Sequence, residues 1–322
     1  MPRMDSFTLA KDKGLLQQLE QLRQRYSAEG QSLNCHLERL RMEVNLDYDN
    51  YLCLDTLLTL QKPKTLYADE FIFIVYHQIV ELYFQLMLWE LKQLTQLHPR
   101  PEPAVFVEKI ERISRYFEII NASFVVMGEG MDKEEFLQFR YALFPASGFQ
   151  SAQFRLIEAH ATDAYNLLGY KWRQQLSRDL PLETLYEKSY WKRGAIDVAT
   201  NSKSVTLTDF EKKHDGTLLA TLRTMRYTNL NQIYLNHYLP LDSDQQIARA
   251  LRRFDQLANI HWPDAHLKVA MKYLGHNGPK AAKSTGGTNW RKYLNPRFQR
   301  ISYFPRLWSP EELENWGHHH KK

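Results

Sequence analysis

One histidine stands in the most apolar stretch of the chain, where its ring could take part in binding or catalysis. His77 lies in the segment 69–84, whose spacing predicts a helix with apolar residues around almost all of its circumference. With about 3.6 residues per turn, Phe73, His77 and Glu81 share one face. We therefore expect His77 to be buried or to line a cavity. From this pattern alone, a hydrogen-bonded core histidine is the more common interpretation.

A second histidine, His266, lies on another predicted helix. Trp262 precedes it by one turn, and Ala270 and Tyr273 follow it by one and two turns. A haem needs little more from a sequence than an imidazole on a helix, an apolar pocket and a second side open to small ligands. The chain can supply these features, although the spacing alone favours an ordinary core histidine here too.

The residues disfavour three other kinds of chemistry. A di-iron centre requires Glu-x-x-His twice on facing helices, and the motif from Glu211 to His214 occurs once, with two lysines inside it. The segment 278–285 looks like a phosphate-binding loop, but Ala282 replaces the glycine needed before Lys283. The chain has no recognisable context for a serine or cysteine nucleophile.

Composition and charge describe an ordinary globular protein. The 322 residues can bury a large core, with 43% hydrophobic and 25% charged residues. Lys and Arg number 42 against 37 Asp and Glu, and they are scattered, so we expect no nucleic-acid partner. Cys35 and Cys53 are too few for a disulfide framework, and we interpret both as small core residues of a cytoplasmic protein.

No segment predicts export or a membrane partner. Residues 1–14 lack the apolar region of a secretory signal. The segment 71–89 is the most apolar in the chain, but His77 and Glu81 lie inside it and glutamates flank it. We therefore interpret it as a core helix.

Helical spacing dominates the sequence and predicts an all-α protein built as a single large helical bundle. Capping-box spacing at Asp132 and Glu135, and at Thr208 and Glu211, indicates two helix starts. The predicted helices cover 15–26, 50–61, 69–96, 103–127, 132–144, 149–168, 208–238, 244–260 and 263–275. Along the chain we predict an N-terminal helix and arm in 1–47, the all-α domain in 48–316 and a disordered tail in 317–322, with the polar segment 187–205 as an excursion from the bundle.

Several separated segments resemble one family, in the same order. They are the segment 51–58, Tyr76-His77-Gln78 with Glu81-Leu82-Tyr83, Phe139-Arg140, the segment 146–151, Trp262 with His266 and Gly275, and Thr285-Gly286-Gly287. This set spans about residues 48–316 and closely resembles tryptophan 2,3-dioxygenase.

The resemblance implies roles for individual residues. His266 matches the proximal haem ligand, and His77 matches the catalytic histidine beside the substrate indole N–H. Arg140 matches the arginine that pairs with the substrate carboxylate, a role suited to a planar, bidentate guanidinium. The residues implied to contact substrate are Phe73, Ile74, Val75, Tyr76, His77, Phe136, Arg140, Thr285, Tyr48, Tyr51 and Leu52, with Ser147 and Gly286 behind them.

This sequence departs from the family at two places. Phe136 stands where some members have tyrosine, which removes one possible hydrogen bond to the substrate. The segment between Gly275 and Thr285 is longer than in the family, so the dynamics of that loop are expected to differ.

The implied reaction is oxidative cleavage of the indole C2–C3 bond of L-tryptophan by O2, giving N-formyl-L-kynurenine in the first step of tryptophan catabolism. The implied cofactor is haem b, one per subunit and ferrous in the active form. The family also implies a homotetramer in which Tyr48, Tyr51 and Leu52 reach the site of a neighbouring subunit. The sequence alone slightly favours the other interpretation, in which this stretch is the first core helix of a monomer.

Two alternatives stay open at this point. One is a haem oxygenase of the same superfamily acting on another indole or aromatic amino acid. The other is a non-catalytic haem-based sensor, which would have no need of Arg140.

Overall fold

The computed structural model describes residues 12–41, 47–144, 150–196, 202–275, 291 and 294–318, and it confirms the predicted all-α class. Within these ranges, β-structure is limited to two isolated bridges, Leu168 with Ser189 and Ile196 with Lys203. The chain divides into two compact units, residues 1–60 and 61–322, and each is described by itself.

The described part of the first unit consists of helices, two of which have an aspartate as the N-terminal cap. Its helices are α2 (Lys13–Ala28), α3 (Leu33–Arg41), α4 (Tyr48–Leu52) and α5 (Leu54–Leu57). The helix predicted for 50–61 is wrong, because Cys53 adopts a left-handed conformation with φ 53° and separates α4 from α5. The prediction that Cys35 and Cys53 are core residues is also wrong, since both are exposed.

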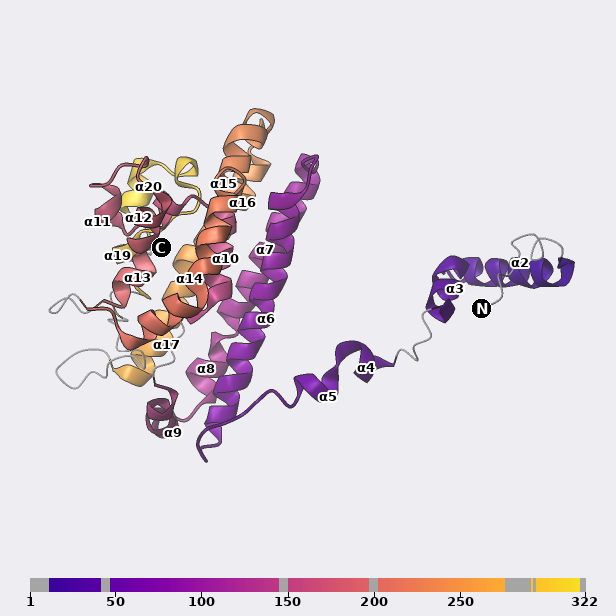
Figure 1. The fold of residues 1–322 in the computed structure, drawn as a ribbon, viewed down its shortest axis with the longest axis horizontal. Helices are drawn as coiled ribbons and strands as arrows, with labels where there is room; N and C mark the ends of the chain where they lie inside the picture. The colour runs from indigo at the N-terminus through magenta and orange to yellow at the C-terminus, as the bar shows by residue number, and fades with distance from the viewer. Residues whose placement is uncertain are drawn as a thin grey trace. The chain divides into compact units, whose positions relative to one another are not determined.

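The second unit is built around the long helix α6 (Asp69–Gln96), which has the predicted bounds. It packs against α7 (Pro103–Ala122) and α10 (Ala152–Ala161), and α7 packs in turn on α16 (Gln246–Gln256), as Figure 1 shows. By length and composition α6 could cross a membrane. Ten of its residues, among them Phe84, Met87 and Leu91, are nevertheless buried against the other helices. This burial explains its apolar composition.

Two predicted helices are interrupted near the candidate site. The helix predicted for 103–127 ends at Ala122, and α8 (Phe124–Gly130) starts after Ser123, whose hydroxyl donates to the Ile120 carbonyl at 2.9 Å. The helix predicted for 132–144 is α9 (Lys133–Phe139) followed by the 3₁₀ helix η1 (Arg140–Leu143). The predicted start of α9 is confirmed, because the Asp132 carboxylate accepts from the Glu135 N–H at 2.9 Å.

The two helices predicted on either side of residue 262 form one continuous helical segment. A π-helical turn, η6 (Leu257–His261), joins α16 to α17 (Trp262–Leu274). The Trp262 N–H donates to the Leu257 carbonyl five residues back, and Pro263 follows with no N–H to donate. Gly275, with φ 85°, ends α17.

The C-terminal segment is tied to the same helical pair by one buried carboxylate. Asp255, on the last turn of α16, is fully buried and accepts hydrogen bonds from Ser302 Oγ at 2.7 Å, the Tyr303 N–H at 2.8 Å and Trp308 Nε1 at 2.9 Å. These contacts fix the helical segment that carries His266 against residues 301–308.

The remaining helices are short, apart from α14 (Val205–Met225). They are η3 (Ala164–Leu167), α11 (Tyr170–Arg173), α12 (Leu182–Glu187), α13 (Tyr190–Gly194), α15 (Leu230–Ile233), η4 (Tyr234–Tyr238), η5 (Leu239–Leu241), α19 (Pro296–Gln299), η7 (Pro305–Leu307) and α20 (Pro310–Glu314). Two predicted helices are therefore shorter than expected: 149–168 is α10 followed by η3, and 208–238 is α14 followed by α15 and η4. Helix α14 starts at Val205 because Ser204, rather than the predicted Thr208, caps it.

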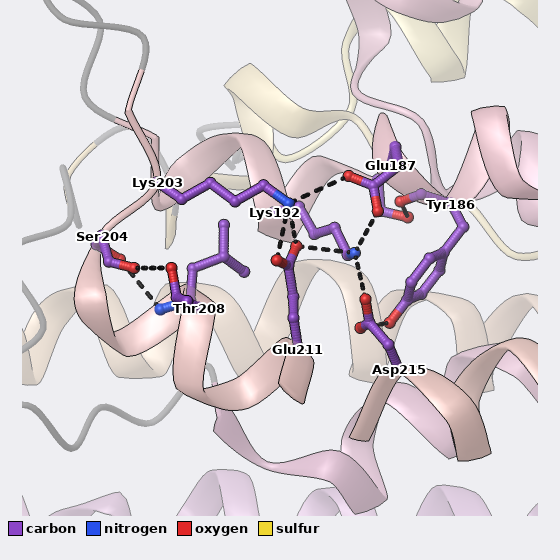
Figure 2. A network of polar contacts seen from close by, with 10 residues as sticks. Tyr186, Glu187, Lys192, Lys203, Ser204, Thr208, Glu211 and Asp215 are labelled. Carbon is purple, nitrogen blue, oxygen red and sulfur yellow. Dashed lines mark hydrogen bonds and ion pairs between the residues drawn. The ribbon is translucent and has the colours of Figure 1, made fainter. Parts of the chain in front are cut away.

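The polar segment predicted as an excursion packs on α14 through a buried lysine, shown in Figure 2. Lys192 is 1% exposed, and its ammonium lies 2.9 Å from Glu187, 2.9 Å from Glu211 and 3.1 Å from Asp215. Tyr186 donates to Asp215 at 2.6 Å and presents its ring to the same ammonium at 3.9 Å. These three carboxylates lie close enough together to hold a metal ion, but the Lys192 ammonium already occupies the place of a cation between them.

Candidate active site

Helix α6 places His77 with a defined orientation of its ring. Its Nδ1 lies 2.7 Å from the carbonyl oxygen of Phe73, one turn back, and the Phe73 and His77 rings are 4.1 Å apart. Because a carbonyl can only accept, Nδ1 must carry the proton of the neutral ring. The lone pair is therefore on Nε2, which can accept a hydrogen bond from another group.

Helix α17 places His266 among aromatic rings. Phe124 from α8 lies 5.6 Å away and Trp262 6.3 Å away, between ring centroids. The imidazole of His266 makes no hydrogen bond within the described part of the chain, and the residue is half-buried. Both properties leave a ring nitrogen available as a ligand to a metal.

A chain of aromatic contacts joins the two histidines. The Tyr76 ring lies 5.7 Å from His77 and 5.9 Å from Phe124, which in turn contacts His266. The structure therefore brings these two predicted site residues together from separate helices.

Both imidazoles are neutral at pH 7. Burial lowers the pKa of His266 to about 4. Burial also lowers the pKa of His77, against the opposing effects of the hydrogen bond to Phe73 and the charge of Glu81. A neutral imidazole is the form that binds metals and accepts hydrogen bonds.

Arg140 lies at the start of η1, directly after α9. It is 4% exposed, and burial lowers its pKa, although a guanidinium remains charged at any physiological pH. Phe136, one turn earlier, contacts Phe73 at 6.3 Å and Tyr273 at 4.8 Å. Through these rings, the helix that precedes Arg140 packs against both α6 and α17.

Helix α17 is held close to α8. The Tyr273 hydroxyl lies 2.5 Å from the carbonyl of Met127 and 3.0 Å from that of Met131. A methyl group on Gly128 would stand 3.4 Å from Val269, so α8 has little room for a side chain there. The position of His266 relative to Phe124 is thus set by packing and by hydrogen bonds to the backbone.

The other predicted site residues lie in different surroundings. Ile74 and Val75 are half-buried on α6, and Val75 points away from His77, about 160° around the helix. Tyr48, Tyr51 and Leu52 belong to the first unit and are 72%, 68% and 41% exposed. Ser147, Thr285 and Gly286 lie outside the described residues.

Sequence reasoning did not single out Phe124 or Gln153. Phe124 connects the two histidines, yet in the sequence it is one of many apolar residues at helical spacing. Gln153 crosses from α10 to α6 and donates to both the carbonyl and the carboxylate of Glu81, each at 2.8 Å. Only its place next to the segment 146–151 could have drawn attention to it.

The fold and site define an all-α protein with two histidines among aromatic rings, and with a buried arginine directly after a helix that packs on those rings. The family model described as tryptophan 2,3-dioxygenase matches residues 34–190. A tryptophan 2,3-dioxygenase of Ruegeria sp. (strain TM1040) is 26% identical over 281 residues, which covers 82% of this chain and 91% of the relative. One from Bacillus thuringiensis subsp. konkukian is 28% identical over 279 residues, with the same coverage. Another, from Anaeromyxobacter dehalogenans, is 40% identical over 114 residues, which covers 35% of this chain and 43% of the relative.

These similarities confirm the resemblance that the sequence motifs indicate. Over most of its length, the chain is similar to tryptophan 2,3-dioxygenases, which are oxidoreductases.

Proposed function

We propose that the protein is a haem-dependent enzyme that cleaves the indole C2–C3 bond of L-tryptophan with O2 and releases N-formyl-L-kynurenine. The main support is that His77 and His266 meet at one group of aromatic rings from two separate helices. The buried Arg140 follows directly after α9, whose Phe136 packs on Phe73. The names of the family and of the curated relatives support tryptophan as the substrate.

The described residues fit a haem. His266 is neutral and makes no hydrogen bond within the described part of the chain, so its imidazole could hold the haem iron. Phe124 and Trp262 supply an apolar wall beside it. Bound haem b, one per subunit and ferrous in the active form, would supply the iron at which O2 reacts.

The chain's own residues bind and orient the substrate in this proposal. The Arg140 guanidinium, held away from water, pairs with the carboxylate of the amino acid. His77 accepts the indole N–H at Nε2, because Nδ1 is engaged with Phe73. Phe73 and Phe136 wall the ring, and the aromatic packing excludes water from the reacting carbons.

We further propose that the enzyme is a cytoplasmic homotetramer, as the family resemblance implies. An exposed apolar stripe along α6 supports burial against another subunit. It consists of Phe71, Ile79, Leu82, Leu86 and Trp89. The arm residues Tyr48, Tyr51 and Leu52, together with Thr285, stay proposed substrate contacts.

An absorption spectrum tests the cofactor, and a product assay tests the reaction. Purified protein should show a Soret band that shifts in the reduced state when L-tryptophan is added. With O2 and L-tryptophan it should release N-formyl-L-kynurenine without a consumed reductant. Absence of the Soret band would exclude the haem assignment. Turnover of another indole alone, or haem without turnover, would favour the alternative oxygenase or the sensor.

A further inference from the structure

We infer that Glu81 is a positioning residue for this site, whose carboxylate, held by Gln153, acts through His77 on the hydrogen bond to the substrate. The inference rests on the proposed function for the identity of the substrate. The contact between Glu81, Gln153 and the helix turn of His77 stands on the geometry alone.

The carboxylate of Glu81 is fixed next to the turn that carries His77. Glu81 follows His77 by one helical turn and lies on the same face of α6. Gln153 Nε2 donates to the Glu81 backbone carbonyl and to its Oε2, both at 2.8 Å. Gln153 is itself held at the start of α10, where Ser151 caps the helix through the Phe154 N–H. The charge of Glu81 therefore has a defined position relative to the ring of His77.

The surroundings of residue 81 would suit a neutral glutamine better than the native carboxylate. The carboxylate therefore serves a purpose other than stability. Glu81 is half-buried and forms no ion pair with any described residue. With Nε2 directed at Glu81, Gln153 Oε1 is buried without a hydrogen-bond partner among the described residues. A glutamine at position 81 could accept from Gln153 in the same way and could also offer a donor to Oε1. The native carboxylate thus leaves a buried polar atom unsatisfied, as residues retained for function often do.

The charge acts on His77 in the direction that substrate binding needs. When Nε2 accepts an indole N–H, positive charge builds up on the imidazole, and a nearby carboxylate stabilises it. Glu81 raises the pKa of His77 against the effect of burial. Among the described residues, the other ionisable groups of the site are Tyr76 on α6, Arg140 on η1 and His266 on α17. None of them supplies a negative charge, because burial raises the pKa of the Tyr76 hydroxyl further above its usual range.

The substitution Glu81→Gln removes the charge and keeps the shape. In the holoenzyme, we expect the Kd for L-tryptophan to rise roughly threefold to thirtyfold, because one nearby charge is lost from a half-buried site. The Kd for 1-methyl-L-tryptophan, which has no indole N–H, should change much less. The variant should also unfold at an equal or higher denaturant concentration. Glu314→Gln, an equal change of charge at an exposed position on α20, is the control.

A second measurement keeps this inference separate from the proposed function. NMR of isotope-labelled histidine, with His77→Gln used for assignment, should show a lower pKa for His77 in the Glu81→Gln protein. If L-tryptophan does not bind the native protein, the proposed function fails, and the NMR result still decides the role of Glu81. An unchanged pKa of His77, or an equal loss of affinity for both indoles, would overturn the inference.

Discussion

At the scale of single residues, the two site histidines differ in what their ring nitrogens contact. His77 has one nitrogen committed to the Phe73 carbonyl, so its ring cannot turn without losing that hydrogen bond. His266 makes no hydrogen bond to the described protein and is fixed by packing against Phe124 and Trp262. The first arrangement suits an acceptor of a substrate hydrogen bond, and the second suits a metal ligand.

We predict that His266→Ala loses haem, whereas His77→Ala keeps haem and loses only part of its activity. In the proposed site His266 would hold the iron directly, whereas the hydrogen bond from His77 to the substrate would contribute roughly 0.5 to 3 kcal/mol. The ratio of Soret absorbance to protein absorbance measures haem content in both variants. Unchanged haem content in His266→Ala would show that this residue is not the ligand.

Arg140→Leu should weaken binding of L-tryptophan strongly. A substrate carboxylate left unpaired in a buried site costs about 2 to 5 kcal/mol, which appears as a higher KM. Tryptamine, which has no carboxylate, should respond little to the same change. Arg140→Lys is the matched variant, because it keeps the charge and loses the bidentate geometry. Equal effects on tryptophan and tryptamine would contradict the carboxylate role.

Spacing alone identified residues that could do chemistry but not what they do. His77 and His266 have the pattern of ordinary core histidines, and only the resemblance to a family assigned them roles. The contacts of Phe124 and Gln153 depend on which helices pack together, which local periodicity does not determine. Cys53 was expected in the core because of its residue type, yet it is exposed between two short helices.

At the scale of elements, strong apolar periodicity predicted long helices better than their interruptions. The bounds of α6 were predicted correctly because its apolar run has clear ends. The break at Ser123 and the π-helical turn before Trp262 were not predicted. Both depend on single hydrogen bonds, Ser123 Oγ to Ile120 and Trp262 N–H to Leu257, that leave little trace in a hydrophobic pattern.

The buried lysine in Figure 2 should hold the segment 182–196 onto α14. Lys192→Met leaves three carboxylates facing one another with only Lys203 nearby, and we expect it to lower the free energy of unfolding by about 3 kcal/mol or more. Lys203→Met, at a side chain that is 40% exposed, should lower it by less than about 1 kcal/mol. Urea unfolding of the two variants measures the difference. Equal losses would show that the burial of Lys192 adds nothing.

At the scale of the whole molecule, two apolar clusters share the second unit. One surrounds α6, α7 and α16, and the other packs Tyr186, Trp191 and Phe210 between α12, α13 and α14. Helix α10 contributes to both, since Phe154 belongs to the first cluster and Ala159 to the second. The proposed site lies within the first cluster, so the segment 182–196 supports α10 rather than contacting the proposed reaction centre.

Acid should destabilise the fold through its buried histidines. Burial lowers the pKa of His160 to about 4, below its value in the unfolded chain. As the pH falls, His160 therefore takes up a proton in the unfolded chain before it does so in the folded protein. The free energy of unfolding that this histidine contributes above pH 6.5 is lost as the pH falls towards 4, and the loss amounts to up to about 3 kcal/mol. The lowered pKa values of His77 and His266 also reduce stability in acid, whereas the raised pKa values of Glu158 and Asp255 oppose this loss.

The His160 contribution can be isolated by substitution. The free energy of unfolding of His160→Gln, measured in urea at several pH values, should fall less steeply between pH 6.5 and 4.5 than that of the native protein. His237→Gln, at an exposed position in the same unit, is the control and should follow the native slope. Identical slopes for all three proteins would show that protonation of His160 is not linked to unfolding.

Exposed apolar side chains in both units indicate that the protein assembles with other chains. The α6 stripe leaves large side chains in water, with Trp89 65% exposed, and Tyr51 of the first unit is 68% exposed. Such surfaces are usual where another chain packs. If pocket formation depends on a neighbouring chain, stability should depend on protein concentration.

Complementation between two inactive chains would test the proposed exchange of N-terminal arms. Tyr51→Arg and Arg140→Leu should each inactivate their own homo-oligomer, because each removes one part of every proposed site. Co-expressed, the two chains should regain partial activity, since some sites in a mixed oligomer receive an intact Tyr51 from one subunit and an intact Arg140 from another. Light scattering and mass spectrometry would verify the mixed oligomer. A fully active monomer, or a verified mixed oligomer without activity, would rule out composite sites.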